Sequence, residues 1–85
     1  MQSFEYVITD TAGLHARKAG LLVKKAKSYR GRVTVAAKGR ECEATRLMAL
    51  MSMCVKCGET VTVTISGEDE ERFAHELAEV FKTDF

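Results

Sequence analysis

The residues best suited to chemistry lie in the stretch GLHARK at positions 13–18, where one histidine stands beside two cations. Gly13 allows the chain to turn sharply, and the apolar spacing that follows predicts a helix directly after His15. The first N–H groups of a helix lack intrahelical acceptors and, together with the helix dipole, attract an anion. With Arg17 and Lys18 nearby, this pattern predicts a small anion site beside the imidazole, of a kind that suits phosphate.

Positive surroundings oppose the protonation of an imidazole, so we expect His15 to stay neutral and nucleophilic. Histidine is among the side chains that form covalent intermediates, and a phosphoryl group on this ring would bring negative charge into a site arranged to receive it. One interpretation of His15 is therefore a phosphate carrier. The other, commoner for a lone histidine, is a residue that caps a helix or fills a turn.

Length and composition narrow the classes of protein. A chain of 85 residues with 46% hydrophobic residues and no proline predicts a single domain, residues 1–85, around one modest core. The net charge of +1 argues against a nucleic-acid-binding protein that depends on bulk electrostatics. No apolar run is long enough to span a bilayer and no signal-peptide pattern is present, so we expect a cytoplasmic protein without membrane insertion.

Cysteine spacing suggests a second, weaker site. Cys54 and Cys57 have the spacing used by redox and zinc sites, but a structural zinc needs four ligands and only Cys42 or His75 could add to the pair. Because no second pair is present, we expect reduced thiols and no metal. A metal or redox module remains the minor alternative.

Hydrophobic periodicity predicts the elements that must position His15. Alternation predicts strands over residues 3–8, 32–37 and 59–65, and a short strand over 40–43 after a turn at 38–39. Helical spacing predicts helices over 16–28, 45–53 and from 68 to near the carboxyl end, with Gly31 as a left-handed terminator of the first and Ser66-Gly67 as a cap of the last. Each of the longer predicted strands has one apolar face, so all the helices should cover the same side of the sheet. The prediction is an α/β open-faced sandwich of order β-α-β-β-α-β-α.

Two of the predicted helices carry apolar residues that should remain exposed. In the helix over 45–53, Leu50 and Met53 can turn inward while Leu47, Met48 and Met51 face solvent. Methionine is flexible, which suits a surface that accommodates several partners, although filling gaps in the core is an equally supported role. In the first helix, Leu21 falls outside the buried stripe and lies among cations, which also hints at a partner surface.

These features together resemble the HPr family, the histidine-containing phosphocarrier proteins of the bacterial sugar phosphotransferase system. The likeness covers GLHAR at 13–17, the element order, the helix at 48–53, Gly58 and the entry to the last helix at 66–67. It implies a four-stranded antiparallel sheet with three helices on one face. It also implies a relay in which phosphorylated enzyme I passes a phosphoryl group to His15, which gives it to an enzyme IIA component. Such a carrier has no turnover of its own and is not an enzyme.

The resemblance further implies roles for neighbouring residues. In the family the phosphate is carried on Nδ1, with a backbone N–H such as that of Ala16 and the arginine matching Arg17 at hand. Partners dock around the first two helices of what should be a monomer without a cofactor, on an apolar patch with a cationic rim. The matching residues here are Gly20, Leu21, Lys24, Lys27, Leu47, Met48 and Met51.

Three positions depart from the family pattern. Lys18 replaces the usual proline, but it is compatible with a helix and adds a positive charge, so transfer should survive. Arg46 replaces the serine at which HPr kinase acts in many members, so that regulation cannot occur there, and Thr45 is either a weaker acceptor or a helix cap. Cys54 replaces a glycine that often ends the second helix, which leaves the local backbone conformation open.

Two other functions remain as alternatives. A regulatory HPr paralogue would bind partners without carrying phosphate, and the presence of His15 and Arg17 argues against it. A small nucleic-acid-binding module would need exposed aromatic residues on its sheet, whereas the polar strand positions here are mostly threonine and acidic residues. The sugars that would be served are not encoded in any of these patterns.

Overall fold

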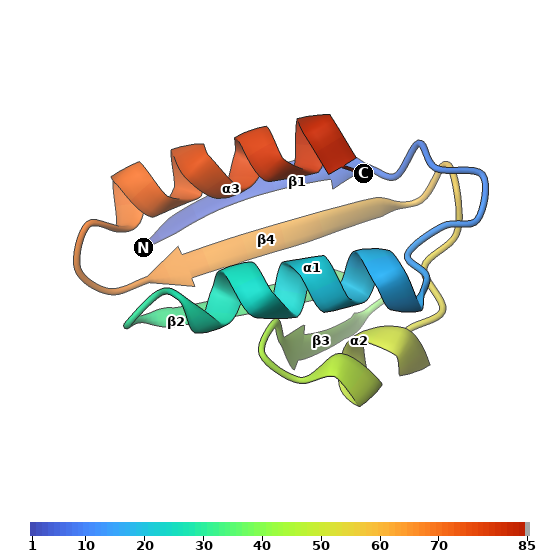
Figure 1. Cartoon of the computed structure of the whole chain (residues 1–85), viewed down its shortest axis with the longest axis horizontal. Coiled ribbons are helices and arrows are strands. Elements are labelled where there is room, and N and C mark those ends of the chain that lie inside the picture. Colours follow the sequence, from blue (N-terminus) through green and yellow to red (C-terminus); the bar gives the residue numbers. More distant parts are fainter. Residues whose placement is uncertain (85) are drawn as a thin grey trace.

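The four strands pair into one antiparallel sheet, and the three helices lie together on one side of it (Figure 1). The structure is a computed structural model that describes residues 1–84. Its strands are β1 (Gln2–Val7), β2 (Arg32–Ala37), β3 (Arg40–Glu43) and β4 (Thr60–Ser66), and its helices are α1 (Ala16–Lys27), α2 (Leu47–Ser52) and α3 (Glu70–Asp84). The predicted order of elements and the open-faced sandwich are both confirmed.

The register of the sheet places apolar residues in rows on the helix side. Val63 in the central strand β4 pairs with Phe4 of β1 on one side and with Val35 of β2 on the other. Because side chains alternate along a strand, this register puts Thr62 and Thr64 on the opposite face. The spatial order is β1-β4-β2-β3, so the charged strand β3 forms one edge, where its side chains discourage pairing with another chain.

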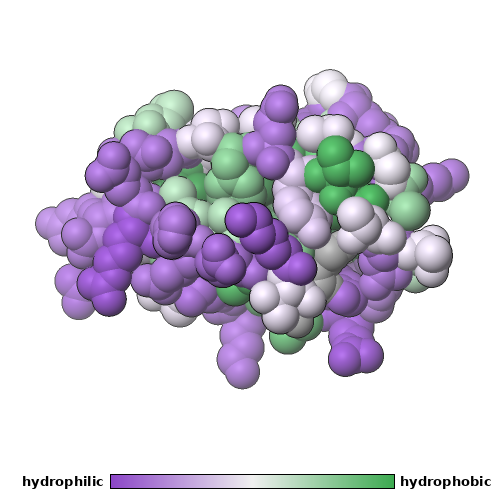
Figure 2. All heavy atoms as spheres, turned by 90° about the horizontal axis from the view of Figure 1, so that it is seen from above, coloured by the Kyte–Doolittle hydropathy of each residue, from purple (hydrophilic) through white to green (hydrophobic). Residues whose placement is uncertain are grey.

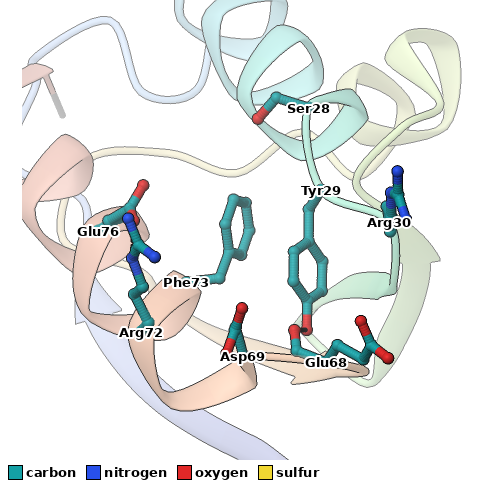
Figure 3. Close-up of a pocket in the computed structure, with 8 residues that line it drawn as sticks. All are labelled: Ser28, Tyr29, Arg30, Glu68, Asp69, Arg72, Phe73 and Glu76. Carbon is teal, nitrogen blue, oxygen red and sulfur yellow. Dashed lines mark hydrogen bonds and ion pairs between the residues drawn. The ribbon is translucent and has the colours of Figure 1, made fainter.

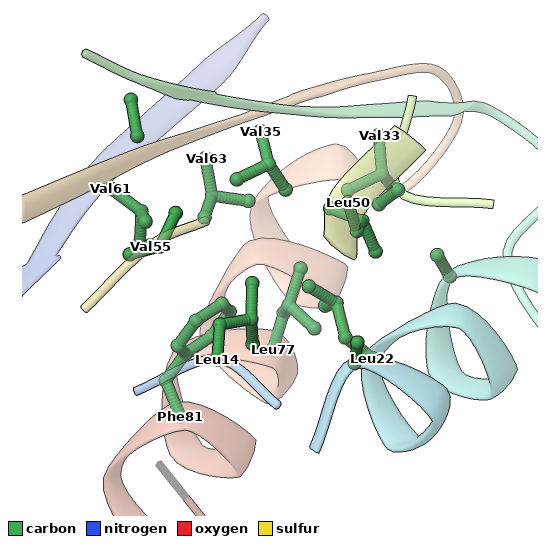
Figure 4. Packing of buried hydrophobic residues seen from close by; sticks show 14 of the residues in the cluster. Leu14, Leu22, Val33, Val35, Leu50, Val55, Val61, Val63, Leu77 and Phe81 are labelled. Carbon is green, nitrogen blue, oxygen red and sulfur yellow. The ribbon is translucent and has the colours of Figure 1, made fainter. Parts of the chain in front are cut away.

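The core fills the space between the sheet and the helices (Figure 4). Helix α1 contributes Ala19, Leu22 and Ala26, and α3 contributes Phe73, Leu77 and Phe81. The Phe81 ring meets the edge of the Phe4 ring at a centroid distance of 5.7 Å, an arrangement that aromatic pairs favour. No described helix combines the length and apolar character that a bilayer crossing requires.

Two predicted helix boundaries were wrong. Helix α3 begins at Glu70, where the N–H of Phe73 donates to the carbonyl of Asp69 (2.9 Å), so Ser66 and Gly67 lie in the preceding turn and do not cap it. Gly31 does not have a positive φ and so is not a left-handed terminator. Instead, a Cβ at Gly31 would lie 2.3 Å from the carbonyl oxygen of Ser66, so glycine is required there by the close approach of two turns.

Cys54 follows α2 with φ of 51°, in the left-handed region that glycine adopts without cost. Its carbonyl oxygen accepts a hydrogen bond from Lys38 Nζ (3.1 Å), which holds this backbone in place. The conformation is therefore one that suits glycine, and the cysteine side chain adds strain.

We expect Cys54→Gly to stabilise the protein by about 0.5–1 kcal/mol, because relief of the left-handed strain exceeds the gain in unfolded-state freedom. Chemical denaturation monitored by circular dichroism measures this change. Cys57→Gly is the matched control, because Cys57 has no positive φ, and it should be destabilising. Equal effects of the two substitutions would contradict the assignment of strain to Cys54.

Candidate functional site

His15 lies at the amino-terminal end of α1, as predicted, and its side chain is 35% exposed. It is the N-cap residue, with an extended backbone (φ −90°, ψ 174°), and its carbonyl accepts the first helical hydrogen bond from the N–H of Ala19 (2.8 Å). The N–H groups of Ala16 and Arg17 precede that bond and have no acceptor among the described residues. A reachable imidazole therefore lies beside two backbone donors that can receive an anion.

The loop that carries His15 rests against the segment that follows α2. Figure 1 shows the two connections running side by side at the end of the sheet. The N–H of Leu14 donates to the carbonyl of Val55 (3.0 Å), and Ile8 exchanges backbone hydrogen bonds with Gly58 and Glu59 at 2.7 and 3.0 Å. The backbone just before His15 is thus held by a second, distant part of the chain.

Glu59 fixes that supporting segment. Its carboxylate accepts a hydrogen bond from the N–H of Lys56 (2.5 Å) and pairs with Lys38 Nζ (3.1 Å), which also donates to the carbonyl of Cys54. The Lys56 N–H, followed by the ammonium of Lys38, lowers the pKa of the Glu59 carboxyl. The carboxylate is therefore charged at neutral pH, and its contribution to stability would be lost only as the pH falls through that lowered value.

Asp10 is the site residue that sequence reasoning missed. Its Oδ1 accepts a hydrogen bond from the N–H of Ala12 (2.8 Å), and its Oδ2 lies 3.7 Å from His15 Nε2 and 3.6 Å from Lys18 Nζ. The Ala12 N–H, followed by the charges of Lys18 and His15, lowers the pKa of Asp10, so it is an anion at neutral pH. The sequence predicted only positive charge around the imidazole, whereas the structure shows surroundings of mixed charge.

The two predicted cations have different environments. Arg17 is exposed, and its guanidinium makes no hydrogen bond or ion pair with another described residue, so it can turn towards a bound anion. Lys18 is turned towards Asp10 and is largely covered, with 20% of its side chain exposed. The positive charge that Lys18 adds at the site is thus partly met by a carboxylate within the chain.

The residues predicted to form a partner surface lie on α1 and α2, which pack against each other. Leu47, Met48 and Met51 are 38%, 78% and 37% exposed, whereas Leu50 and Met53 are buried, as predicted. Leu21 is 40% exposed on α1, next to the exposed Lys24. By contrast, the side seen over α3 is mostly hydrophilic and shows only small, separated hydrophobic areas (Figure 2). We refer below to the docking surface, which consists of Gly20, Leu21, Lys24, Lys27, Leu47, Met48 and Met51.

The cysteines do not converge on one point. Cys54 and Cys57 are exposed, while Cys42 packs with its Sγ 3.3 Å from Met53 Sδ, and burial raises the pKa of the Cys42 thiol. Within residues 1–84, no three His, Cys, Asp or Glu side chains lie close enough to hold a metal ion. His75 is exposed on α3 and does not join the pair. The geometry therefore offers no support for a zinc site.

A separate hollow of about 260 Å³ lies between the carboxyl end of α1 and the start of α3 (Figure 3). Its wall is a stacked pair, Tyr29 and Phe73, with ring centroids 4.2 Å apart. The Tyr29 hydroxyl donates to the carbonyl of Glu68 (2.7 Å), and burial, with nearby acidic residues, raises the pKa of Tyr29. The hollow is remote from His15, and the Tyr29 hydroxyl on its wall holds two turns together. We therefore interpret the hollow as a packing feature.

Comparison with known proteins identifies the family of this chain. The family model described as the phosphorylation site of the HPr component of the phosphotransferase system matches residues 2–83. The chain belongs to the HPr family. It is 34% identical to the phosphocarrier protein HPr of Xylella fastidiosa (strain 9a5c) over 85 residues, covering all of this chain and 96% of that protein.

Solved structures agree with this assignment. HPr-C-His from Thermoanaerobacter tengcongensis superposes with a TM-score of 0.91 at 29% identity, over 98% of this chain and 93% of that one. The catabolite repression protein Crh of Bacillus subtilis, which crystallised as an intertwined, domain-swapped dimer, is 31% identical with a TM-score of 0.75, over 99% and 97% of the two chains. The chain thus belongs to a family of phosphoryl carriers and not to a family of enzymes.

The position that carries the regulatory serine in many HPr proteins is occupied by Arg46. It is the N-cap of α2, without a side-chain cap, and its Nε lies 3.8 Å from Glu43 Oε2. Thr45 therefore precedes the cap, and the alternative in which Thr45 caps α2 was wrong. Thr45 is exposed, so it remains a candidate acceptor on geometric grounds alone.

Gly13 offers a direct test of how His15 is positioned. Its φ is +69°, and a Cβ there would lie 2.4 Å from the carbonyl oxygen of Val55, so Gly13→Ala should cost at least about 2 kcal/mol in the free energy of unfolding. Gly20→Ala is the matched control, because a Cβ on this helical residue meets nothing within 4 Å, and it should stabilise the protein by about 1 kcal/mol. Urea denaturation gives both values. A neutral Gly13→Ala would show that the loop does not need this contact.

Proposed function

We propose that His15 accepts a phosphoryl group from phosphorylated enzyme I and passes it to enzyme IIA components. The observation that carries this proposal is the placement of a partly exposed imidazole at the amino-terminal end of α1, beside the N–H groups of Ala16 and Arg17, which have no acceptor within residues 1–84. That placement falls within the part of the chain matched by the HPr phosphorylation-site family. A histidine that only capped the helix would not need both reactive exposure and an adjacent anion site.

The proposed step needs little from this chain beyond position and charge. A lone pair on His15 forms a bond to phosphorus while the bond from phosphorus to the donor atom of enzyme I breaks, and the electron pair of that bond returns to the donor. The phosphoryl oxygens carry negative charge throughout, so the amides at the start of α1 and the Arg17 guanidinium stabilise the group as it arrives. Because the donor and the acceptor supply the remaining groups, the carrier is a relay and not a catalyst with its own turnover.

The docking surface supports the same function. Exposed Leu21, Met48 and Met51 supply apolar contact area close to the helix that begins at His15, and exposed Lys24 and Lys27 supply a positive rim. A partner with an apolar groove and acidic edges would be complementary to this surface. Flexible methionine side chains allow one surface to fit a donor and several acceptors. We propose that the chain works as a monomer, which leaves this surface open.

A regulatory role without phosphate transfer is the second candidate. It is favoured by the similarity to Crh of Bacillus subtilis, which is related to catabolite repression and forms a domain-swapped dimer. In such a role the docking surface would bind a partner and His15 would not carry phosphate. The unpaired amides and the free Arg17 beside His15 favour transfer, since a silent histidine would not need them.

Phosphorylation by enzyme I distinguishes the two candidates. We expect the native chain, incubated with enzyme I and phosphoenolpyruvate, to gain the mass of one phosphoryl group, and the modification to be lost in acid, as a phosphorus–nitrogen bond would be. His15→Ala should gain none while keeping its circular dichroism spectrum. A native chain that stays unmodified with an active enzyme I would reject the carrier role and leave the regulatory one.

Arg17 should matter for the rate and not for the fold. Because it is exposed and without a protein partner among residues 1–84, Arg17→Ala should leave the free energy of unfolding within about 0.5 kcal/mol of the native value. Loss of its charge should slow phosphorylation of His15 by about 100-fold, measured by rapid quench with enzyme I. Arg30→Ala, which removes an exposed guanidinium at the other end of α1, is the control and should not slow it.

The docking surface can be tested with matched apolar residues. Met48 is 78% exposed on α2, and Val7 is 49% exposed on the other face of the sheet. Met48→Ala should raise the KM of enzyme I for this carrier about tenfold, a loss of about 1.4 kcal/mol typical of an interface residue, while Val7→Ala should not change it. Steady-state phosphorylation at varied carrier concentration measures both. Equal KM values would place the partner elsewhere.

A further inference from the structure

Within residues 1–84, Asp10 is the carboxylate paired with the His15 imidazole, and nothing in the family assignment gives this residue a role. We propose that Asp10 is a positioning residue that holds the proton of His15 on Nε2 and thereby leaves the lone pair of Nδ1 free to accept phosphorus. The proposal deepens the carrier function and rests on it. Lys18 completes the device by balancing the charge of Asp10.

The geometry fixes Asp10 on two sides. Its Oδ1 accepts the N–H of Ala12 at 2.8 Å, and its own carbonyl accepts the N–H of Gly13 at 2.9 Å, so the turn before His15 is built on this residue. With Oδ1 and the backbone engaged, Oδ2 is left to face the helix, 3.7 Å from His15 Nε2. At this distance the negative charge of Oδ2 attracts a hydrogen on Nε2 of the neutral ring, and a direct hydrogen bond forms if the two groups approach to about 2.8 Å. The lowered pKa of Asp10 keeps it an acceptor over the whole neutral range.

The charge beside Nε2 favours one of the two neutral tautomers of the ring. A carboxylate accepts hydrogen bonds but cannot donate one, so it stabilises the form with hydrogen on Nε2 and the lone pair on Nδ1. In that form transfer requires no proton to leave. Nδ1 bonds to phosphorus, the donor bond breaks with its electron pair returning to the donor, and the hydrogen stays on Nε2. The phosphorylated ring then carries a positive charge, which Asp10 partly neutralises.

Lys18 explains how a carboxylate can stand in an anion site. An unpaired Asp10 would repel the incoming phosphoryl group, but Lys18 Nζ lies 3.6 Å from the same Oδ2. Arg17 and the unpaired amide of Ala16 add positive character at the start of α1, and Lys56 lies on the segment against which Gly13 packs. The net charge near the ring is therefore still favourable to phosphate, while its Nε2 side remains anionic.

Asp10→Asn tests the proposal sharply. The amide oxygen can keep the Ala12 hydrogen bond, but the amide nitrogen then takes the place of Oδ2 and donates to Nε2, which favours hydrogen on Nδ1. In ¹⁵N spectra of the imidazole, recorded where the ring is neutral, we expect the native chain to hold its hydrogen mainly on Nε2 and the variant to shift towards Nδ1. Phosphorylation by enzyme I should be about tenfold slower in the variant. Asp69→Asn, a carboxylate in the turn before α3, is the control and should change neither.

Asp10→Ser serves as the second variant if the asparagine perturbs the loop. Serine can still accept the Ala12 N–H but is too short to reach the ring, so it should abolish the tautomer preference without reversing it. Unchanged tautomers in both variants would overturn the proposal and leave Asp10 a turn residue only. A native chain that is never phosphorylated would instead reject the carrier function, while the ¹⁵N spectra would still decide whether Asp10 directs the proton.

Discussion

The hydrogen bond from the N–H of Leu14 to the carbonyl of Val55 is the contact on which the site depends. It fixes the backbone one residue before His15 against a segment that lies far along the chain. Only a glycine at position 13 permits the two backbones to approach this closely, because a Cβ would meet the Val55 carbonyl. The position of the imidazole at the helix end is therefore set by tertiary contact and not by the helix alone.

This contact joins the loop that carries His15 to the end of α2, on which part of the docking surface is proposed. The segment 53–59 follows α2 at one end and supports the His15 loop at the other. Lys38 and Glu59 brace it from the hairpin and from the start of β4, and Cys54 within it has a left-handed backbone. The exposed residues of α2 thus lie on an element that is continuous with the support of the His15 ring. Such an arrangement holds these residues and the imidazole at a constant separation, which the proposed in-line transfer between two proteins would require.

Much of this could be predicted from the sequence, since alternation in β2 and β4 and the helical stripe of α1 each have one strong period. The exposed side of α2 was also predictable, because a helix of two turns cannot bury five large apolar residues. The start of α3 could not be predicted, because any of the acidic residues at 68–71 is suitable for the first turn of a helix. In the structure the Tyr29 hydroxyl donates to the Glu68 carbonyl, which keeps residues 68 and 69 in the turn, and the helix begins at Glu70. Gly31 was predicted to end a helix because glycine often stands just after one. Its actual constraint is the close approach of the turn at 66–67, which the local sequence does not reveal.

The site shows the same limit in a more instructive form. The types and spacing of His15 and Arg17 already indicate an anion site, because they lie on one element with a known geometry.

Asp10 could be recognised from sequence as a turn residue whose side chain accepts an N–H two positions on, but the direction of its second oxygen depends on how the loop packs on segment 53–59. Lys18, taken alone, reads as one more positive charge for phosphate, and only its 3.6 Å separation from Asp10 shows that it has a second partner. Lys18 and Asp10 are therefore best understood as one feature. The carboxylate alone would repel phosphate, and the ammonium alone would oppose a positive charge on the ring. Together the two charges leave the net charge of the site unchanged and give the two ring nitrogens different surroundings.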